Sequence, residues 1–187
     1  MGIAIIVLLL FILAVIAFFI GIYNQLIRLR QRVKNAWSQV DVQLKRRHDL
    51  IPNLVEVAKG YMAHERNTLE NVIKARNIAS SAQGMDEKKN AENFLTSTLR
   101  SLFAVVENYP NLKADTQMLA LQEQLTNTEN KISFARQYYN DEAMRLNTQI
   151  EVFPSNIIAE RFNFKKEAFF EIEDAAQRET PKVDFTR

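Results

Sequence analysis

The pattern of apolar and polar residues divides the chain near residue 23. Every residue from Ile3 to Tyr23 is apolar apart from Gly21, and the first charged side chain is Arg28. A helix of this length extends about 30 Å, which matches the hydrocarbon thickness of a bilayer. A buried core helix would normally carry a polar face, and this segment has none. The pattern therefore predicts a membrane-spanning helix over residues 3–23.

The residues on either side of this segment predict its orientation. No Lys or Arg precedes it, the apolar run is longer than a signal-peptide core, and no small-x-small cleavage site closes it. These features disfavour a cleaved signal peptide. Four basic residues follow before the first acidic residue, Asp41, and they are Arg28, Arg30, Arg32 and Lys34. The positive-inside rule then places the N-terminus outside and the rest of the chain in the cytoplasm, with these side chains suited to anionic headgroups.

From residue 24 to about residue 79, apolar residues recur in steps of three and four, which predicts a helix with one buried stripe. The stripe comprises Leu26, Val33, Trp37, Val40, Leu44, Ile51, Val55, Ala58, Met62, Leu69 and Val72. Pro52 favours a kink or a break, but the stripe keeps its phase across it, so we predict one long kinked helix that tolerates Gly60. No Gly, Pro or polar linker follows Tyr23. The membrane helix should therefore continue directly into this helix.

Two more long helices are predicted beyond a loop at residues 80–86. The second runs from about residue 87 to 108, with an apolar side formed by Phe94, Leu95, Leu99, Leu102, Val105 and Val106. After a turn at Tyr109–Pro110, the third runs from about residue 112 to 150. Its stripe of Leu121, Leu125, Thr128, Ile132, Ala135, Tyr139, Ala143, Leu146 and Ile150 predicts coiled-coil-like packing along its whole length. Ser155 should then cap a short helix that ends near Phe162.

Long helices and short connections predict an all-α protein in which a single N-terminal transmembrane helix continues into an antiparallel helical bundle. We divide the chain into an anchor (1–23), the bundle (24–162) and a C-terminal part (163–187) with a helix over about 166–177 and an extended tail. Six of the twelve phenylalanines lie between residues 153 and 185. They should cover the open end of the bundle. The alternative is a patch for a partner subunit or a membrane, formed by Phe162, Phe164, Phe169 and Phe170 beside Arg161, Lys165 and Lys166.

The amino-acid composition limits the kinds of binding site and catalytic site that the chain can form. With 24 Lys+Arg, 22 Asp+Glu and a net charge of +2, the chain has no basic footprint for nucleic acid. The absence of cysteine excludes disulfides, thiolate metal sites and a cysteine nucleophile. Four scattered glycines form no phosphate loop, and neither His48 nor His64 belongs to a metal-binding pair. We therefore expect no enzymatic activity, no cofactor and no small-molecule substrate, with both histidines in polar contacts at the bundle surface. A metal centre built only from carboxylates is the remaining enzymatic alternative.

A polar residue interrupts the apolar stripe of the first predicted helix. Arg47 or His48 falls between Leu44 and Ile51, where the stripe needs an occupant. Since an unpaired buried charge is costly, a carboxylate should face it, with Glu129 or Asp49 as the candidates. The rest of the Lys45–His48 run is expected to be solvated, because consecutive residues point in different directions around a helix. The alternative is a site for phosphate or acidic lipid.

The segment AWSQVDVQLKRRHDLIPNLVEVAKGYMAHE, from Ala36 to Glu65, resembles the LemA family of bacterial membrane-anchored proteins. The resemblance continues through Ala75–Arg76, YPNLKA from Tyr109, LTNTENKISFARQYYN from Leu125, and Phe153–Pro154. It implies a cytoplasmic bundle behind one helix in a bacterial inner membrane, and it supplies no catalytic residues. The positions that match the family motifs are Trp37, Asp41, Gln43, Lys45, Arg46, Arg47, Pro52, Asn53, Tyr109, Pro110, Glu129, Asn130, Arg136 and Tyr139. We expect them to make the polar and aromatic contacts that join the first and third helices.

These features predict a non-enzymatic scaffold or interaction module at the cytoplasmic membrane face. Its partners would be the lipid bilayer and either further copies of the chain or another membrane protein. The alternative function is a membrane-anchored sensor or signalling adaptor. A ligand-sized cavity lined by the motif residues would favour that alternative.

Overall fold

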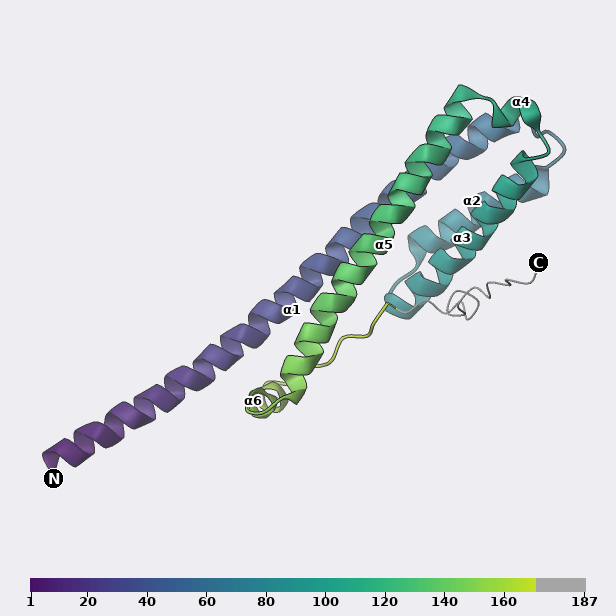
Figure 1. Ribbon diagram of the computed structural model, residues 1–187. Helices are drawn as coiled ribbons and strands as arrows, with labels where there is room; N and C mark the ends of the chain where they lie inside the picture. The colour runs from purple at the N-terminus through teal and green to yellow at the C-terminus, as the bar shows by residue number, and fades with distance from the viewer. Residues whose placement is uncertain (171–187) are drawn as a thin grey trace, which may run out of the picture.

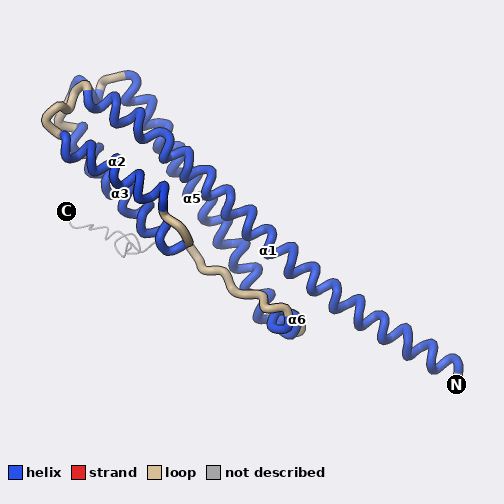
Figure 2. The backbone as a smooth tube through the Cα atoms, turned by 180° about the vertical axis from the view of Figure 1, so that it is seen from behind, coloured by secondary structure: helices blue, strands red, loops and turns tan. Residues whose placement is uncertain are grey.

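A computed structural model describes residues 1–170, and these residues form helices joined by short connections, without a strand (Figure 1). The helices are α1 (Gly2–Lys59), α2 (Arg66–Ser81), α3 (Met85–Val106), α4 (Pro110–Lys113), α5 (Thr116–Glu151) and α6 (Ser155–Arg161). α1 and α5 run side by side in opposite directions, and the α2–α3 hairpin lies beside the half of this pair that is farther from the N-terminus (Figures 1 and 2). The all-α antiparallel bundle behind a long N-terminal helix is confirmed.

The apolar segment and the bundle share one uninterrupted helix. α1 comprises 58 residues and passes through Gly21 without a break. Its residues 2–21 are exposed apart from the partly buried Phe19, and this stretch is long and apolar enough to cross a membrane. The first buried residues of the bundle, Ile22 and Leu26, follow within the next two turns of the same helix. The direct continuation predicted from the absence of a linker is therefore present.

The prediction of one helix over residues 24–79 was wrong at its C-terminal end. α1 crosses Pro52 unbroken but ends at Lys59, and the chain reverses through residues 60–65 into α2. Gly60 weakens the helix at this point, because glycine costs about 1 kcal/mol relative to alanine in a helix interior. Met62, Leu69 and Val72 are nevertheless buried, in the same cluster as Ile51. The periodicity survived the reversal because both helices turn an apolar face toward one core.

The other helix boundaries lie close to the predicted ones. α5 begins at Thr116 rather than at residue 112, because Asp115 caps it with a carboxylate oxygen that accepts hydrogen bonds from the backbone N–H groups of Gln117 and Met118, both 2.9 Å long. These bonds, chiefly the one from Met118, lower the pKa of Asp115. Between α2 and α3, Gly84 adopts a φ of 80°, a conformation that favours glycine. Phe94 was wrongly assigned to the apolar side of α3, since it is exposed.

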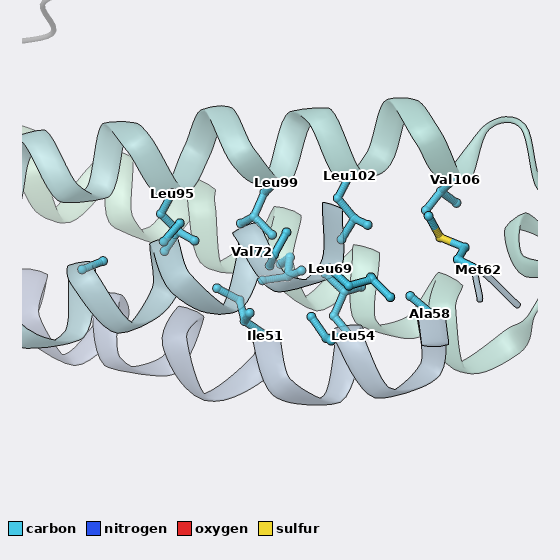
Figure 3. Close-up of a cluster of buried hydrophobic side chains, with 14 of the residues drawn as sticks. Ile51, Leu54, Ala58, Met62, Leu69, Val72, Leu95, Leu99, Leu102 and Val106 are labelled. Carbon is cyan, nitrogen blue, oxygen red and sulfur yellow. The ribbon is translucent and has the colours of Figure 1, made fainter. Parts of the chain in front are cut away.

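Two apolar cores lie along the bundle. The distal core joins the last turns of α1 to α2, α3 and the start of α5, to which Met118 belongs. Leu54, Leu95 and Leu102 are among its buried residues (Figure 3). The proximal core joins the α1 residues nearer the apolar segment to α5 and α6, and it comprises Ile22, Leu26, Val33, Ala36, Val40, Leu44, Ile132, Ala135, Tyr139, Ala143, Leu146, Ala159 and Phe170. α1 and α5 contribute residues to both cores, so these two helices connect the two cores.

The C-terminal part departs from prediction in two ways. Ser155 is the first residue of α6 rather than its cap, and its buried hydroxyl lies 2.6 Å from the carbonyl oxygen of Gln149 at the end of α5. Residues 163–170, here called the C-terminal strap, contain no helix, so the predicted helix over 166–177 is wrong for its first five residues. Its remaining residues and the tail past Pro181 lie outside the described residues. Phe164 and Phe170 of the strap pack against the proximal core, whereas Phe162 and Phe169 are exposed.

Candidate functional site

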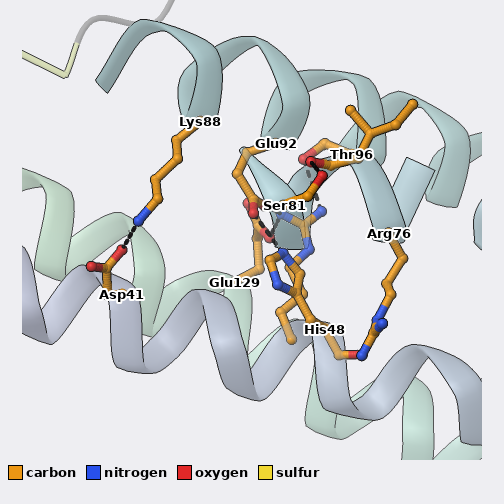
Figure 4. A network of polar contacts seen from close by, with 10 residues as sticks. Asp41, His48, Arg76, Ser81, Lys88, Glu92, Thr96 and Glu129 are labelled. Carbon is orange, nitrogen blue, oxygen red and sulfur yellow. Dashed lines mark hydrogen bonds and ion pairs between the residues drawn. The ribbon is translucent and has the colours of Figure 1, made fainter. Parts of the chain in front are cut away.

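The most polar part of the bundle interior centres on Glu92 of α3. Its side chain is 1% exposed and lies between two consecutive residues of α1. The Nε2 atom of His48 is 2.6 Å from the Oε1 atom of Glu92, and the Nη1 atom of Arg47 is 3.4 Å from its Oε2 atom (Figure 4). The carboxylate of Glu92 thus contacts two consecutive side chains of α1.

The guanidinium group of Arg47 connects three helices. Besides Glu92, its Nη1 atom lies 3.2 Å from the Oε2 atom of Glu129 on α5. Its Nη2 atom donates a 2.8 Å hydrogen bond to the hydroxyl oxygen of Thr96 on α3. The predicted pairing of Arg47 with Glu129 is therefore present. The other candidate, Asp49, instead pairs with Lys45 on the exposed side of α1 at 2.5 Å.

The two histidines have different environments. His48 is 7% exposed, so its expected place at the bundle surface was wrong, although its contact is polar as expected. The α2–α3 hairpin accounts for this burial, because Glu92 meets the imidazole and Arg76 of α2 donates a 3.1 Å hydrogen bond to the backbone carbonyl of His48. His64 lies in the connection between α1 and α2 and is exposed.

Sequence reasoning did not find Glu92, although a signal was present. Glu92 lies three residues before Leu95, and Lys88 lies four residues before Glu92, so both continue the spacing of the α3 stripe. Lys88 donates a 2.7 Å hydrogen bond to Asp41 (Figure 4). Its Nζ atom also lies 5.3 Å from the ring centroid of Trp37. Polar residues in phase with an apolar stripe thus mark where side chains of α3 contact α1.

An aromatic group next to this network joins α1 to α5. The rings of Trp37 and Tyr139 meet edge to face with centroids 5.4 Å apart. The hydroxyl of Tyr139 donates a 2.9 Å hydrogen bond to the carbonyl oxygen of Ala168 in the strap, and burial raises the pKa of Tyr139 to about 12. Arg136 lies 4.3 Å from the ring centroid of Phe170, and burial lowers the pKa of its guanidinium.

The motif residues are not all gathered at one place. Arg47 with Glu129 and Trp37 with Tyr139 make contacts between α1 and α5, as hypothesised, but Asp41 contacts α3. Tyr109 donates a 3.2 Å hydrogen bond to Glu65, which joins the end of α3 to the connection between α1 and α2. The motif positions that are exposed are Lys45, Arg46, Pro52, Asn53, Pro110 and Asn130. Gln43 is partly buried between α1 and α5.

The Glu92 network is paired internally and closed to solvent. Both oxygens of Glu92 face nitrogen atoms of α1, and its 1% exposed side chain leaves no face open to a substrate. Among the described residues, no group of three or more His, Asp and Glu side chains could hold a metal ion. Buried polar contacts of this kind favour one register between helices.

Residues 36–185 match the model of the LemA family. The chain belongs to the LemA family. Among curated relatives, Protein LemA of Metamycoplasma hominis is 26% identical, over 89% of this chain and 75% of that protein. Magnetosome proteins MamQ 1 and MamQ 2 of Paramagnetospirillum magneticum are each 24% identical, over 92% of this chain and 73% of theirs.

The matched region begins at Ala36, inside α1 and beyond the apolar segment. The matched region covers α1 from Ala36 onward and helices α2 to α6, and Arg47, Glu92 and Glu129 lie within it. The relatives' alignments cover more of the chain than the family model does.

Proposed function

We propose that this LemA-family protein is a non-enzymatic single-pass membrane protein that acts as a scaffold at the cytoplasmic face of a bacterial inner membrane. The observation that carries the proposal is the continuity of α1, which runs as one helix from the exposed apolar segment through both cores. A bundle built on the same helix as its anchor is held at a limited range of angles to the membrane. Such rigid coupling suits a platform better than a freely tumbling tethered domain.

Charge supports the orientation of this anchor. Arg28, Arg30, Arg32 and Lys34 are all exposed on α1, directly on the bundle side of the apolar segment. Basic residues at this position favour an outside N-terminus and a cytoplasmic bundle. The relatives' names also fit a role in organisation, because MamQ 1 and MamQ 2 are named for the magnetosome rather than for a reaction.

A groove between α1 and α5 offers a surface for assembly. It has a volume of about 540 Å³, and its lining includes Val42, Phe134 and Tyr138. Val42 is 62% exposed and Phe134 is 72% exposed, although both are apolar. Copies anchored in one membrane share a common orientation, so a second copy of the chain is the partner that we propose for this groove.

Disulfide crosslinking tests this scaffold, because the chain contains no cysteine. Phe134→Cys, placed in the groove, should give a crosslinked dimer after mild oxidation of native membranes. Leu119→Cys is the matched control, since it is exposed on the same helix but does not line the groove. Monomer alone for both variants, with no reproducible partner by mass spectrometry, would refute the scaffold, and equal dimer at both positions would refute the groove.

A second cleft supports the alternative of a sensor. It measures about 550 Å³, and its lining includes the motif residues Trp37 and Tyr139, the three cations Arg30, Lys34 and Lys88, and one acidic residue, Glu167. Three cations beside an aromatic surface suit a phosphate-bearing ligand. Because Trp37 is the only tryptophan, its fluorescence should change saturably with inorganic phosphate or soluble glycerophosphoglycerol, and Lys34→Gln should weaken the response while Lys45→Gln should not. A flat titration with both probes would remove this alternative.

A further inference from the structure

The base of the bundle, where α5 ends and α6 begins, lies level with the last turn of the apolar segment. Phe19, inside that segment, packs against the proximal core, to which α6 contributes Ala159. The ring of Tyr23 lies 4.8 Å from that of Phe162, centroid to centroid. In Figure 1, α6 lies beside α1 at the point where α1 leaves the bundle. If residues 3–23 span a bilayer, this base lies at its surface.

The same base exposes several large apolar side chains. Phe153 is 79% exposed, Phe162 is 56% exposed and Ile157 is 50% exposed. The opposite side of α6 is already occupied, because Ser155 and Ala159 are buried against the bundle. Large apolar side chains exposed at one end of the bundle indicate an interaction surface, and aromatic side chains are favoured at the headgroup level of a membrane.

The charged residues named here leave the base with a net charge of only +1, so electrostatic attraction alone does not account for a membrane contact. Arg161 and Lys165 are exposed, as is Glu160, while Lys166 pairs with Glu151. The exposed apolar side chains are therefore the feature of the base that calls for an interaction partner. A lipid surface fits them, because the adjoining segment of α1 is itself exposed and apolar.

We infer that the turn between α5 and α6, together with α6, is a second membrane contact in which Phe153, Ile157 and Phe162 insert shallowly into the leaflet that α1 enters. This inference rests on the proposed membrane anchor. Two contacts on one rigid body fix both its tilt and its rotation about α1, which a single transmembrane helix does not do. The groove between α1 and α5 would then face a constant direction along the membrane.

Spin labels placed on single cysteines in the full chain test this contact. Phe153→Cys and Ile157→Cys report on the base. Ile16→Cys reports on the anchor, and Leu119→Cys is the matched aqueous control because it is an exposed apolar residue on α5 that lies outside the groove. In liposomes of phosphatidylethanolamine and phosphatidylglycerol, the ratio of oxygen to nickel-chelate accessibility at residues 153 and 157 should be several-fold higher than at residue 119. Liposomes of phosphatidylcholine should give the same ordering.

The possible outcomes distinguish a failure of the second membrane contact from a failure of the transmembrane anchor. A lipid-like ratio at residue 16 with a water-like ratio at residues 153 and 157 would overturn the second contact alone. A water-like ratio at residue 16 would overturn the anchor and the inference with it. A lipid-like ratio at the base only with phosphatidylglycerol would also overturn the inference, because shallow apolar insertion does not require anionic lipid. Circular dichroism of each labelled variant checks that the bundle is intact.

Discussion

Glu92→Ala should destabilise the bundle by about 3–5 kcal/mol, which is the range for breaking a buried ion pair by removing one partner. The substitution leaves Arg47, whose side chain is 4% exposed, and the buried His48 without the carboxylate that faces both of them. Arg47 would keep Glu129, but that carboxylate is 45% exposed and compensates only part of the loss. Thermal unfolding of the full-length protein in detergent, followed by far-UV circular dichroism, measures the effect.

Three further variants sharpen this prediction. Glu129→Ala should cost about 1 kcal/mol or less, because the partly exposed pair is screened and Arg47 keeps Glu92. Glu70→Ala is the surface control, since it breaks only an exposed pair with Arg66. The triple variant Arg47→Met, His48→Leu, Glu92→Leu should recover much of the lost stability, because apolar residues of similar volume often replace a buried ion pair without loss. If Glu92→Ala melts like Glu70→Ala, the network does not hold the helices together.

The sequence was sufficient for the helix faces but not for every helix end. Spacing of three and four residues identified the buried sides of α1 and α5, and the polar position in the α1 stripe correctly implied a carboxylate across the bundle. Periodicity failed at Gly60 because α1 and α2 bury their faces in one core, so a chain reversal leaves the spacing intact. A reversal depends on where the chain can fold back, and a one-dimensional pattern does not record that.

In the candidate site, too, features set by the local sequence pattern were predicted, whereas contacts between residues far apart in the chain were not. Arg47 was identified because apolar residues of the α1 stripe lie on both sides of it in the sequence. Glu92 was missed because it precedes the apolar residues of the α3 stripe, so it interrupts no apolar pattern. Residues 166–170 were expected to be helical from their composition alone. In the structure their backbone groups bond to side chains of α5, up to thirty positions away along the chain, so no local signal could have revealed this arrangement.

The C-terminal strap is held to α5 mainly through its own backbone. Asn147 donates a 2.9 Å hydrogen bond to the carbonyl oxygen of Glu167 and accepts a 2.8 Å bond from its N–H group. Asn140 makes the same pair of bonds with Phe170, at 3.0 and 2.7 Å. The two asparagines are seven residues apart on α5, which corresponds to a rise of about 10.5 Å. Glu167 and Phe170 are three residues apart in the extended strap, which corresponds to about 10 Å. The spacing of the asparagines therefore matches the spacing of the two backbone positions that they bind.

Replacing both asparagines by alanine should therefore release the strap while leaving the helices folded. The double variant removes four hydrogen bonds, which together contribute about 2–4 kcal/mol to docking at a net value of about 0.5–1 kcal/mol each. Hydrogen exchange of the Glu167 and Phe170 amides should accelerate by about 30-fold or more, since about 1.4 kcal/mol corresponds to a factor of ten. Trypsin should cleave faster after Lys165 and Lys166, with little change in the melting temperature of the bundle.

Asn130→Ala is the matched control, because Asn130 is an exposed asparagine on α5 that lies outside the stretch contacted by the strap. It should leave both exchange and cleavage unchanged. Slow exchange at residues 167 and 170 in the double variant would mean that the packing of Phe170 with Trp37 and Arg136 holds the strap without the asparagines. The asparagine pair would then have no part in positioning the strap.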